Sequence, residues 1–291
     1  MSTELGKVCA VIVTYNVGPR VFDCVHAVID QVGKVVIVDN GSENETLAAL
    51  HKLEALSRVR VIYNRSNLGI ARALNEGVEY ALQHGYRWIL TLDHDSEATP
   101  GMVGKLLQGF AMVGDGLGIV AANPFDRNAQ AFQRLDVRHQ TGCVVTKRPV
   151  NTSGSLVDST VFATVGLFNE PLFLYYVDDE FCARVRRAGF SIAIHCDATL
   201  IHSEGNRVRR RFLWRNVFYD RYSKEARYYI ARNGIYMTAR YPREMGYGYV
   251  HAKRMFIDLV KTVLYDDEPV VKLRYALKGC SDALRGRYGG L

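Results

Sequence analysis

The sequence predicts a doubly wound α/β fold, with a mostly parallel central sheet flanked by helices and a helical extension at the C-terminus. Two observations support this prediction. Short runs of apolar, β-branched residues alternate with stretches whose apolar residues recur at helical spacing. Several of these runs are also apolar at every position, which is typical of strands buried on both faces of a parallel sheet.

The first hundred residues alternate regularly between the two kinds of segment. Strands are expected at 8–14, 35–38, 59–63 and 88–92, and helices at 19–32, 46–56 and 70–84. Ligands of such sheets gather at the carboxyl ends of the strands. This part of the chain therefore predicts a binding site along one edge of the sheet.

The next hundred residues are less regular. Short strands are expected at 118–122, 142–145 and 192–195, and helical segments at 162–168 and from 178 onward; the segment 199–203 presents a histidine after another apolar stretch. The last of these helices begins with Asp178, Asp179 and Glu180. Acids at a helix start commonly do no more than complement the helix dipole, so both a capping role and a chemical role stay open for them.

Length and composition fit one large domain with an appendage. The chain has 291 residues, of which 48% are hydrophobic, and extensive disorder is not expected. No apolar run approaches the roughly 18 residues of a membrane span, and the N-terminus does not resemble a signal peptide, so we expect a cytoplasmic protein. Six cysteines without a C-x-x-C pair indicate reduced thiols rather than disulfides or zinc ligands.

Charge is distributed unevenly along the chain. Residues 206–291 contain 19 Lys/Arg and 8 Asp/Glu, whereas residues 1–205 contain 18 and 22. We therefore divide the chain into a body, 1–205, and a basic, aromatic-rich helical region, 206–291, packed on it. Such a region suits an anionic membrane surface, a nucleic acid or an acidic ligand. Its apolar stripe around residues 256–264 would also suit a homodimer interface.

Polar clusters follow each of the first four expected strands. They are Thr14-Tyr15-Asn16, Asp39-Asn40-Gly41-Ser42, Asn64 to Gly69, and Asp93-His94-Asp95. Two carboxylates spaced i and i+2 at a strand end can turn toward one hard cation, and that cation can hold a diphosphate. The G-x-G-x-x-G and P-loop signatures are absent, which disfavours both a nicotinamide dinucleotide fold and a P-loop. A metal-assisted nucleotide site is therefore predicted.

Taken in order, these motifs resemble the inverting family 2 glycosyltransferases of GT-A fold, and within them the bacterial rhamnosyltransferases. The resemblance extends from Val8 to about Tyr241. It is carried by VTYN at 13–16, VDNGS at 38–42, NLGIARALNEG at 67–77, LDHDS at 92–96, SG at 153–154, DDEFCAR at 178–184, His202 and YYIARN at 228–233. It implies that residues 1–205 form a GT-A catalytic domain that uses a nucleotide-sugar donor.

The resemblance also implies a bound Mg²⁺ or Mn²⁺. A departing diphosphate needs a divalent cation held by hard oxygen ligands. Asp95 is expected to be the more direct ligand, and Asp93 a contact to the ribose or a water-mediated partner. His202 is expected to reach the metal or the diphosphate from the other side.

The remaining donor contacts are expected at the other polar clusters. Thr14, Tyr15, Asn16 and Asp39 would surround the base, with Asp39 accepting the N3–H that uracil and thymine share. Asn67, Gly69 and Asn75 would line the ribose and diphosphate side, where the helix beginning near Ile70 presents backbone N–H groups. Arg72 is a candidate phosphate contact, although a surface arginine without that role is an equal alternative.

Inverting transfer requires a base for the acceptor hydroxyl on the face opposite the diphosphate. The resemblance places this base at Asp178, with Glu180 as an orienting or acceptor-binding carboxylate. Val177 stands where relatives carry a glutamate, and Asp179 is an additional local candidate.

The sequence thus predicts a metal-dependent inverting glycosyltransferase. It is expected to transfer L-rhamnose from dTDP-L-rhamnose to a hydroxyl of a saccharide, or of a lipid-linked saccharide, in bacterial cell-surface polysaccharide synthesis. A lipid-linked acceptor would suit peripheral association with the inner face of the plasma membrane. The alternatives are a transferase for another UDP- or dTDP-linked sugar, a nucleotidyltransferase, and a nucleic-acid-binding protein; the acidic clusters argue against the last, and no nucleic-acid partner is expected.

Overall fold

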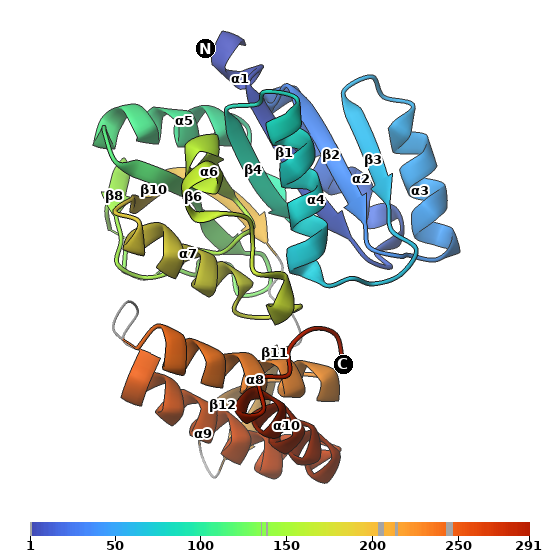
Figure 1. The fold of residues 1–291 in the computed structure, drawn as a ribbon, viewed down its shortest axis with the longest axis vertical. Helices are drawn as coiled ribbons and strands as arrows, with labels where there is room; N and C mark the ends of the chain where they lie inside the picture. Colours follow the sequence, from blue (N-terminus) through green and yellow to red (C-terminus); the bar gives the residue numbers. More distant parts are fainter. Residues whose placement is uncertain (1, 135, 138, 203–206, 213–214, 243–246) are drawn as a thin grey trace.

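A ten-stranded sheet forms the centre of the molecule in the computed structural model, which describes residues 2–134, 136–137, 139–202, 207–212, 215–242 and 247–291. The main path of the sheet has the order β3-β2-β1-β4-β9-β6-β10-β5, and β7 and β8 pair with β6 and β10. Figure 1 shows helices on both faces of this sheet and a helical part below it. The mixed α/β architecture predicted from the sequence is confirmed.

The first half of the sheet is parallel, as predicted. Its strands are β1 (Val8–Thr14), β2 (Lys34–Asp39), β3 (Val59–Tyr63) and β4 (Trp88–Asp93). The helices of this half are α2 (Val21–Val28), α3 (Asn44–Glu54) and α4 (Ile70–Gln83), after the short α1 (Ser2–Leu5). Alternate residues of β1 enter two cores, one shared with α2 and α3 and one with α4. This explains why β1 is apolar at nearly every position.

The second half contains antiparallel and short strands. Its strands are β5 (Glu97–Ala98), β6 (Leu117–Asp126), β7 (Ala131–Phe132), β8 (Cys143–Val145), β9 (Ser155–Asp158) and β10 (Ser191–His202). The helices are α5 (Met102–Val113), α6 (Ser159–Val165) and α7 (Val177–Arg187). The strand expected at 192–195 continues through the following apolar stretch to His202 as one strand, β10, with a shift in register between His195 and Thr199.

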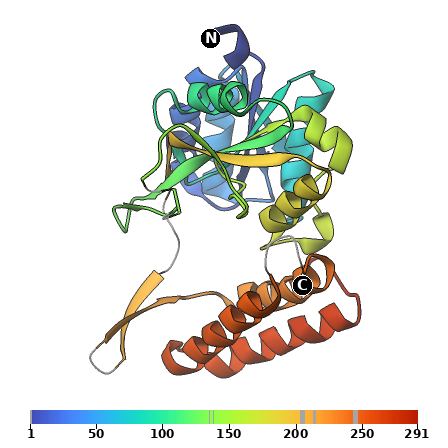
Figure 2. The ribbon, with the colours of Figure 1, turned by 90° about the vertical axis from the view of Figure 1, so that its left-hand side faces the viewer.

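The C-terminal part begins with a β-hairpin that the sequence did not predict. Strands β11 (Arg207–Phe212) and β12 (Arg215–Asp220) pair with each other and extend from the molecule in Figure 2. The run Val217-Phe218-Tyr219 consists of residues that favour strands, although its spacing was interpreted as helical. Helices α8 (Lys224–Arg240), α9 (Tyr247–Tyr265) and α10 (Pro269–Leu284) follow.

Two polar contacts stabilise the C-terminal helices. Lys272 forms a buried ion pair with Asp266, and Tyr228 donates a hydrogen bond to Asp282 across the α8–α10 pair. Within the part of the chain that the structure describes, no helix is long and apolar enough to cross a membrane.

Close packing of α4 on β1 depends on Gly77. A Cβ atom at this position would lie 2.2 Å from Cγ1 of Val11, which is buried in the centre of the sheet. We predict that Gly77→Ala lowers the free energy of unfolding by about 1–3 kcal/mol, because strain from overpacking exceeds the gain in helix propensity. Urea unfolding measures the effect. The exposed α4 variant Gln83→Ala is the control, and equal stability of the two variants would contradict the packing argument.

Candidate functional site

The carboxyl ends of β1, β2 and β4 bring the predicted polar clusters together. Thr14 pairs in register with Asp39, and Val13 pairs with Asp93 on the other side of β1. The last residue of β10, His202, reaches the same edge through contacts with the turn after β4. This edge of the sheet, which we call the rim, therefore holds side chains from four strands.

Asp93, Asp95 and His202 form a group that can hold a metal ion, and we call these three residues the metal group. One ligand atom of each residue lies within 4.8 Å of the others. Nδ1 of His202 lies 3.4 Å from Oδ1 of Asp95 and 3.1 Å from Oγ of Ser96, which in turn lies 2.8 Å from Oγ of Ser153. Two carboxylates and an imidazole are a donor set that fits a divalent ion such as Mn²⁺. The residues present therefore fit the metal implied by the resemblance.

The two carboxylates of this group differ in their electrostatic environment. Burial, together with the nearby charge of Asp95, raises the pKa of Asp93. Burial also opposes ionisation of Asp95, but the hydrogen bond and charge of His202 outweigh it and lower the pKa of Asp95. Asp95 is consequently the more readily ionised ligand, in line with its expected role as the more direct one.

Asp39 is held in place by the residues expected around the base. Its Oδ1 accepts a 3.0 Å hydrogen bond from the Thr14 hydroxyl, and its Oδ2 accepts one of 2.9 Å from the Ser42 amide. Asn16, at a positive φ of 53°, accepts from the Glu43 amide and donates its own amide to Ser42. Tyr15 is 47% exposed at the edge of this cluster, where a planar ring could stack on a base.

Asn67 and Gly69 shape the turn that begins α4. Oδ1 of Asn67 accepts hydrogen bonds from Nδ2 of Asn40 and from the Gly69 amide. Gly69 has a φ of 87°, and a Cβ there would collide with Phe173. The Phe173 carbonyl accepts the Ile70 amide at 2.8 Å. This N–H group at the start of α4 is thus used within the protein, contrary to the expectation that it is free for a diphosphate.

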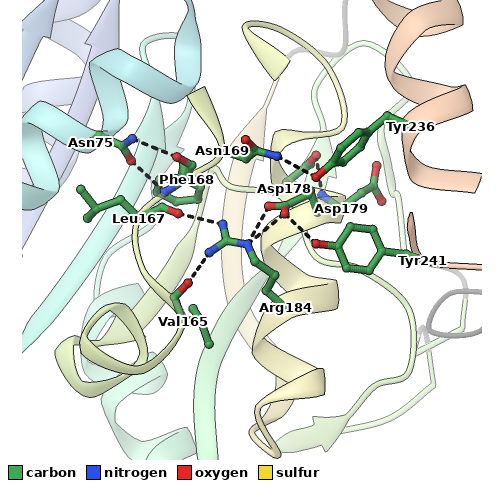
Figure 3. Close-up of polar contacts among 11 residues, drawn as sticks. Asn75, Val165, Leu167, Phe168, Asn169, Asp178, Asp179, Arg184, Tyr236 and Tyr241 are labelled. Carbon is green, nitrogen blue, oxygen red and sulfur yellow. Dashed lines mark hydrogen bonds and ion pairs between the residues drawn. The ribbon is translucent and has the colours of Figure 1, made fainter. Parts of the chain in front are cut away.

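The contacts of Arg72 and Asn75 differ from those expected of donor-binding residues. Arg72 forms ion pairs with Glu76 and Glu170. Asn75 is almost fully buried, donates to the Phe168 carbonyl and to Glu170, and accepts the Phe168 amide (Figure 3). In this structure both side chains attach α4 to the loop before α7, and their contact with a donor stays a prediction.

Asp178 lies at the start of α7 and faces the interior of the body. It lines a small cavity with Thr91 of β4 and Ser155 of β9. Burial, the neighbouring charge of Asp179 and, to a lesser degree, that of Asp93 raise the pKa of Asp178 to about 7. Thr91 precedes Asp93 by two residues on β4, so the candidate base lies beside the strand that carries the first residue of the metal group.

Glu180 occupies the opposite side of the same helix. Two residues correspond to about 200° of rotation in an α-helix, so Asp178 and Glu180 cannot share a face. Glu180 is 2% exposed. Both of its carboxylate oxygens lie 2.9 Å from Nε of Arg184, and Oε1 accepts a 2.8 Å hydrogen bond from the Tyr241 hydroxyl. It lines a groove of about 530 Å³ between α7 and α8. Glu180 therefore faces this groove and not the cavity that Asp178 lines, and its role in acceptor binding stays a prediction.

Several residues of the site had no role assigned from the sequence. Ser96 and Ser153 orient the metal group, while Asn40 and Ser42 support the base-side cluster. All four belong to motifs that the sequence analysis quoted. Their individual roles depend on hydrogen bonds between distant segments, which the motifs do not reveal.

The raised pKa of Asp178 predicts a specific effect on stability. A carboxyl whose pKa is higher in the folded than in the unfolded chain destabilises the fold, fully above the folded pKa and not at all below the unfolded one. We predict that Asp178→Asn raises the free energy of unfolding by about 1–3 kcal/mol at pH 8, with the gain vanishing toward pH 4. Denaturant unfolding at both pH values measures it, with exposed Asp115→Asn as the control. A gain independent of pH would contradict the stated cause.

Comparisons with known proteins agree with this geometry. Residues 9–152 match the family described as Glycosyl transferase family 2. The chain is 27% identical over 302 aligned positions to the dTDP-rhamnosyl transferase RfbF of Shigella flexneri, across 98% of this chain and 97% of that protein.

A solved structure supports the fold alone. The crystal structure of GalNAc-T7 with UDP, GalNAc and Mn²⁺ is similar with a TM-score of 0.57 at 16% identity, over 86% of this chain. The chain corresponds to 54% of that solved chain, about half its length. The predicted GT-A fold is confirmed, residues 9–152 form a glycosyl transferase family 2 domain, and the chain is a glycosyltransferase.

Proposed function

We propose that this glycosyltransferase transfers L-rhamnose from dTDP-L-rhamnose to a hydroxyl of a saccharide acceptor, with inversion at the anomeric carbon. The observation that carries the proposal is the Asp93-Asp95-His202 group on the rim, with the half-buried carboxyl of Asp178 lining a cavity beside Thr91 of the same strand, β4. The choice of donor rests on the relative named dTDP-rhamnosyl transferase, which aligns over nearly the full length. Another dTDP- or UDP-linked sugar is the second candidate.

Asp93, Asp95 and His202 would hold Mg²⁺ or Mn²⁺. A bound divalent ion would offset the negative charge of the departing diphosphate. His202 is positioned for this role by Ser96, whose hydroxyl is in turn fixed by Ser153. Such second contacts orient a metal-binding imidazole and hold its ring in one tautomer.

Asp39 and its neighbours would select the base. The Asp39 carboxylate already accepts one bond on each oxygen, and each oxygen retains a second lone pair for the N3–H of thymine or uracil. Thr14 and Asn16 would keep this carboxylate oriented, and Tyr15 would stack on the ring. Asn67 and Gly69 would shape the turn beside the ribose, whereas Arg72 and Asn75 would act only by supporting α4.

Asp178 would accept the proton of the acceptor hydroxyl. A base that is ionised near neutral pH but still basic must have a raised pKa, and burial beside Asp179 provides this. Asp178 also lies nearer to the sheet than Glu180, which is occupied by Arg184 and Tyr241. These contacts favour Asp178 as the base.

The C-terminal helices would place the enzyme on an anionic membrane that carries a lipid-linked acceptor. On α9, Phe256, Val260, Val263 and Leu264 share one exposed face, with Phe256 68% exposed. On α10, Val270, Leu277 and Leu284 form a second exposed row, and three exposed cations, Arg274, Lys278 and Arg285, border it. Apolar faces edged by cations fit the interface of an anionic bilayer. A symmetric dimer through these faces would instead bring like charges together.

We predict that dTDP-L-rhamnose with Mn²⁺ raises the thermal midpoint of the protein and supports transfer. Asp178→Asn should lower kcat by about 10²- to 10⁴-fold while leaving donor binding intact, the size expected for loss of a general base. Asp95→Ala should abolish the metal-dependent part of donor binding. The control, Asp115→Asn, changes an exposed acid outside the polar clusters of the rim and should leave both kcat and donor binding unchanged.

Two results would overturn this assignment. If neither dTDP- nor UDP-sugars stabilise the protein with metal present, the proposed donor class is wrong. If Asp178→Asn loses donor binding and Asp95→Ala loses only turnover, the roles of metal ligand and base are exchanged.

We predict that the protein sediments with phosphatidylglycerol-containing vesicles and not with phosphatidylcholine vesicles, and that added salt weakens this binding. Replacing Phe256 and Leu264 with serine should weaken it at least about tenfold, because two large apolar side chains are lost from the contact. Met112→Ser, which changes an exposed methionine on α5, is the control. Salt-independent sedimentation would contradict the proposal, as would a change from dimer to monomer in the serine variant without loss of vesicle binding.

A further inference from the structure

The segment that leads into α7 has an unusual backbone. Phe173, Tyr175 and Tyr176 have φ angles of 63°, 65° and 64°, in a region that residues with a side chain rarely adopt. Asp178 follows Tyr176 by two residues, and Tyr176 itself precedes the first residue of α7. The position of the candidate base therefore depends on a backbone that other parts of the molecule must hold.

Asn233 of α8 holds this segment through its side-chain NH₂ group. Its two N–H groups are shared among the carbonyl oxygens of Leu172, Leu174 and Tyr175, which lie 2.9, 2.8 and 3.0 Å from Nδ2. The side chain is completely buried, so water does not compete for these bonds. One amide thus fixes carbonyl groups on both sides of Phe173.

Arg232 holds the same segment from one residue earlier in α8. Its Nη2 donates to the carbonyls of Pro171 at 3.1 Å and Leu172 at 2.8 Å, and its Nε donates to Oδ1 of Asn233 at 2.9 Å. The last bond orients the Asn233 amide so that its NH₂ group faces the carbonyls.

The charge of Arg232 is stabilised in an uncommon way. Its side chain is fully buried, and it forms no ion pair with a carboxylate among the residues that the structure describes. It lies instead within 5.0 to 5.5 Å of three tyrosine rings, those of Tyr228, Tyr229 and Tyr288, and donates to the Gly289 carbonyl at 2.6 Å. In many protein cores, an apolar residue in place of a buried charged one leaves the fold equally stable. Stability therefore does not explain a buried arginine at position 232, whereas its hydrogen bonds to the carbonyl groups of residues 171 and 172 do.

The held segment also contacts the start of α4. The Phe173 carbonyl accepts the Ile70 amide, and the Phe173 ring lies against Gly69 and stacks on Tyr229 of α8 with 5.1 Å between ring centroids. At its other end, the Tyr176 carbonyl accepts the Glu180 amide in the first turn of α7. One segment therefore links α4, which begins at the rim, to α7, which carries Asp178.

We propose that Arg232 and Asn233 are positioning residues of the transfer reaction: by fixing the carbonyls of residues 171–175, they set the location of Asp178 relative to the metal group. The inference rests on the proposed role of Asp178 as the base. It assigns the C-terminal region a part in catalysis that is separate from any contact with a membrane.

The test compares Asn233→Ala with Asn123→Ala, which removes another buried amide whose Nδ2 bonds to the Cys196 carbonyl, away from this segment. Asn233→Ala should lower kcat for sugar transfer by about 100-fold, the loss expected from a misplacement of about 1 Å, with the donor KM changed less than about threefold. Hydrogen exchange in peptides covering residues 171–180 should become faster in Asn233→Ala only. Asn123→Ala should lower the thermal midpoint without either effect.

Each outcome decides between a positioning and a merely structural role. If Asn233→Ala retains kcat, or if both variants lose activity only in proportion to their stability, the inference is wrong. If Asn233→Ala is not recovered folded, Arg232→Lys, which keeps the charge but loses the forked contact with the carbonyls, should show the same kcat loss and exchange pattern. Inactivity of the wild-type protein toward every nucleotide sugar would instead refute the proposed function, while the exchange measurement would still test the contact.

Discussion

The electrostatic repulsion between Asp93 and Asp95 is the constraint that this site must meet. Asp93 ends β4 and Asp95 follows it by two residues, and the charge of Asp95 opposes ionisation of Asp93 unless positive charge is near. His202 contacts Asp95 and Ser96 from the end of β10, more than a hundred residues later in the chain. A divalent ion would supply that positive charge. The sheet is what allows this, because β4 and β10 end at the same rim.

Asp178 is a second acidic residue of the site, and its surroundings shift its pKa in the direction opposite to that of Asp95. Asp178 is half-buried, with Asp179 beside it, and desolvation and the charge of Asp179 raise its pKa. Asp95, with its lowered pKa, is therefore suited to binding a cation, whereas Asp178, with its raised pKa, is suited to accepting a proton. Burial, neighbouring charge and hydrogen bonds create this division of roles from chemically identical side chains.

Local patterns in the sequence predicted much of the fold, and contacts between distant segments account for most of what it missed. The parallel strands β1, β2 and β4 were predictable because burial on both faces makes each an apolar run, and β3 because its β-branched residues favour a strand. The helical character of residues 206–291 was predicted too, but the bounds of α10 were not, since Val270, Leu277 and Leu284 stay exposed while Gly279 packs against the Tyr228 carbonyl. The motifs located Asp93, Asp95, Asp178 and His202, but not the partner of Arg72 and Asn75, Glu170, which lies more than ninety residues further along the chain.

In the proposed site, the metal group and Asp178 would face one bound diphosphate sugar from opposite sides. Anomalous diffraction from a crystal grown with Mn²⁺ and dTDP tests this arrangement. We expect a manganese peak in contact with Asp95 and His202, the nucleotide base beside Asp39, and the diphosphate in the space between the ion and Asp178. A manganese peak away from Asp95, or a nucleotide bound in the groove between α7 and α8, would contradict it.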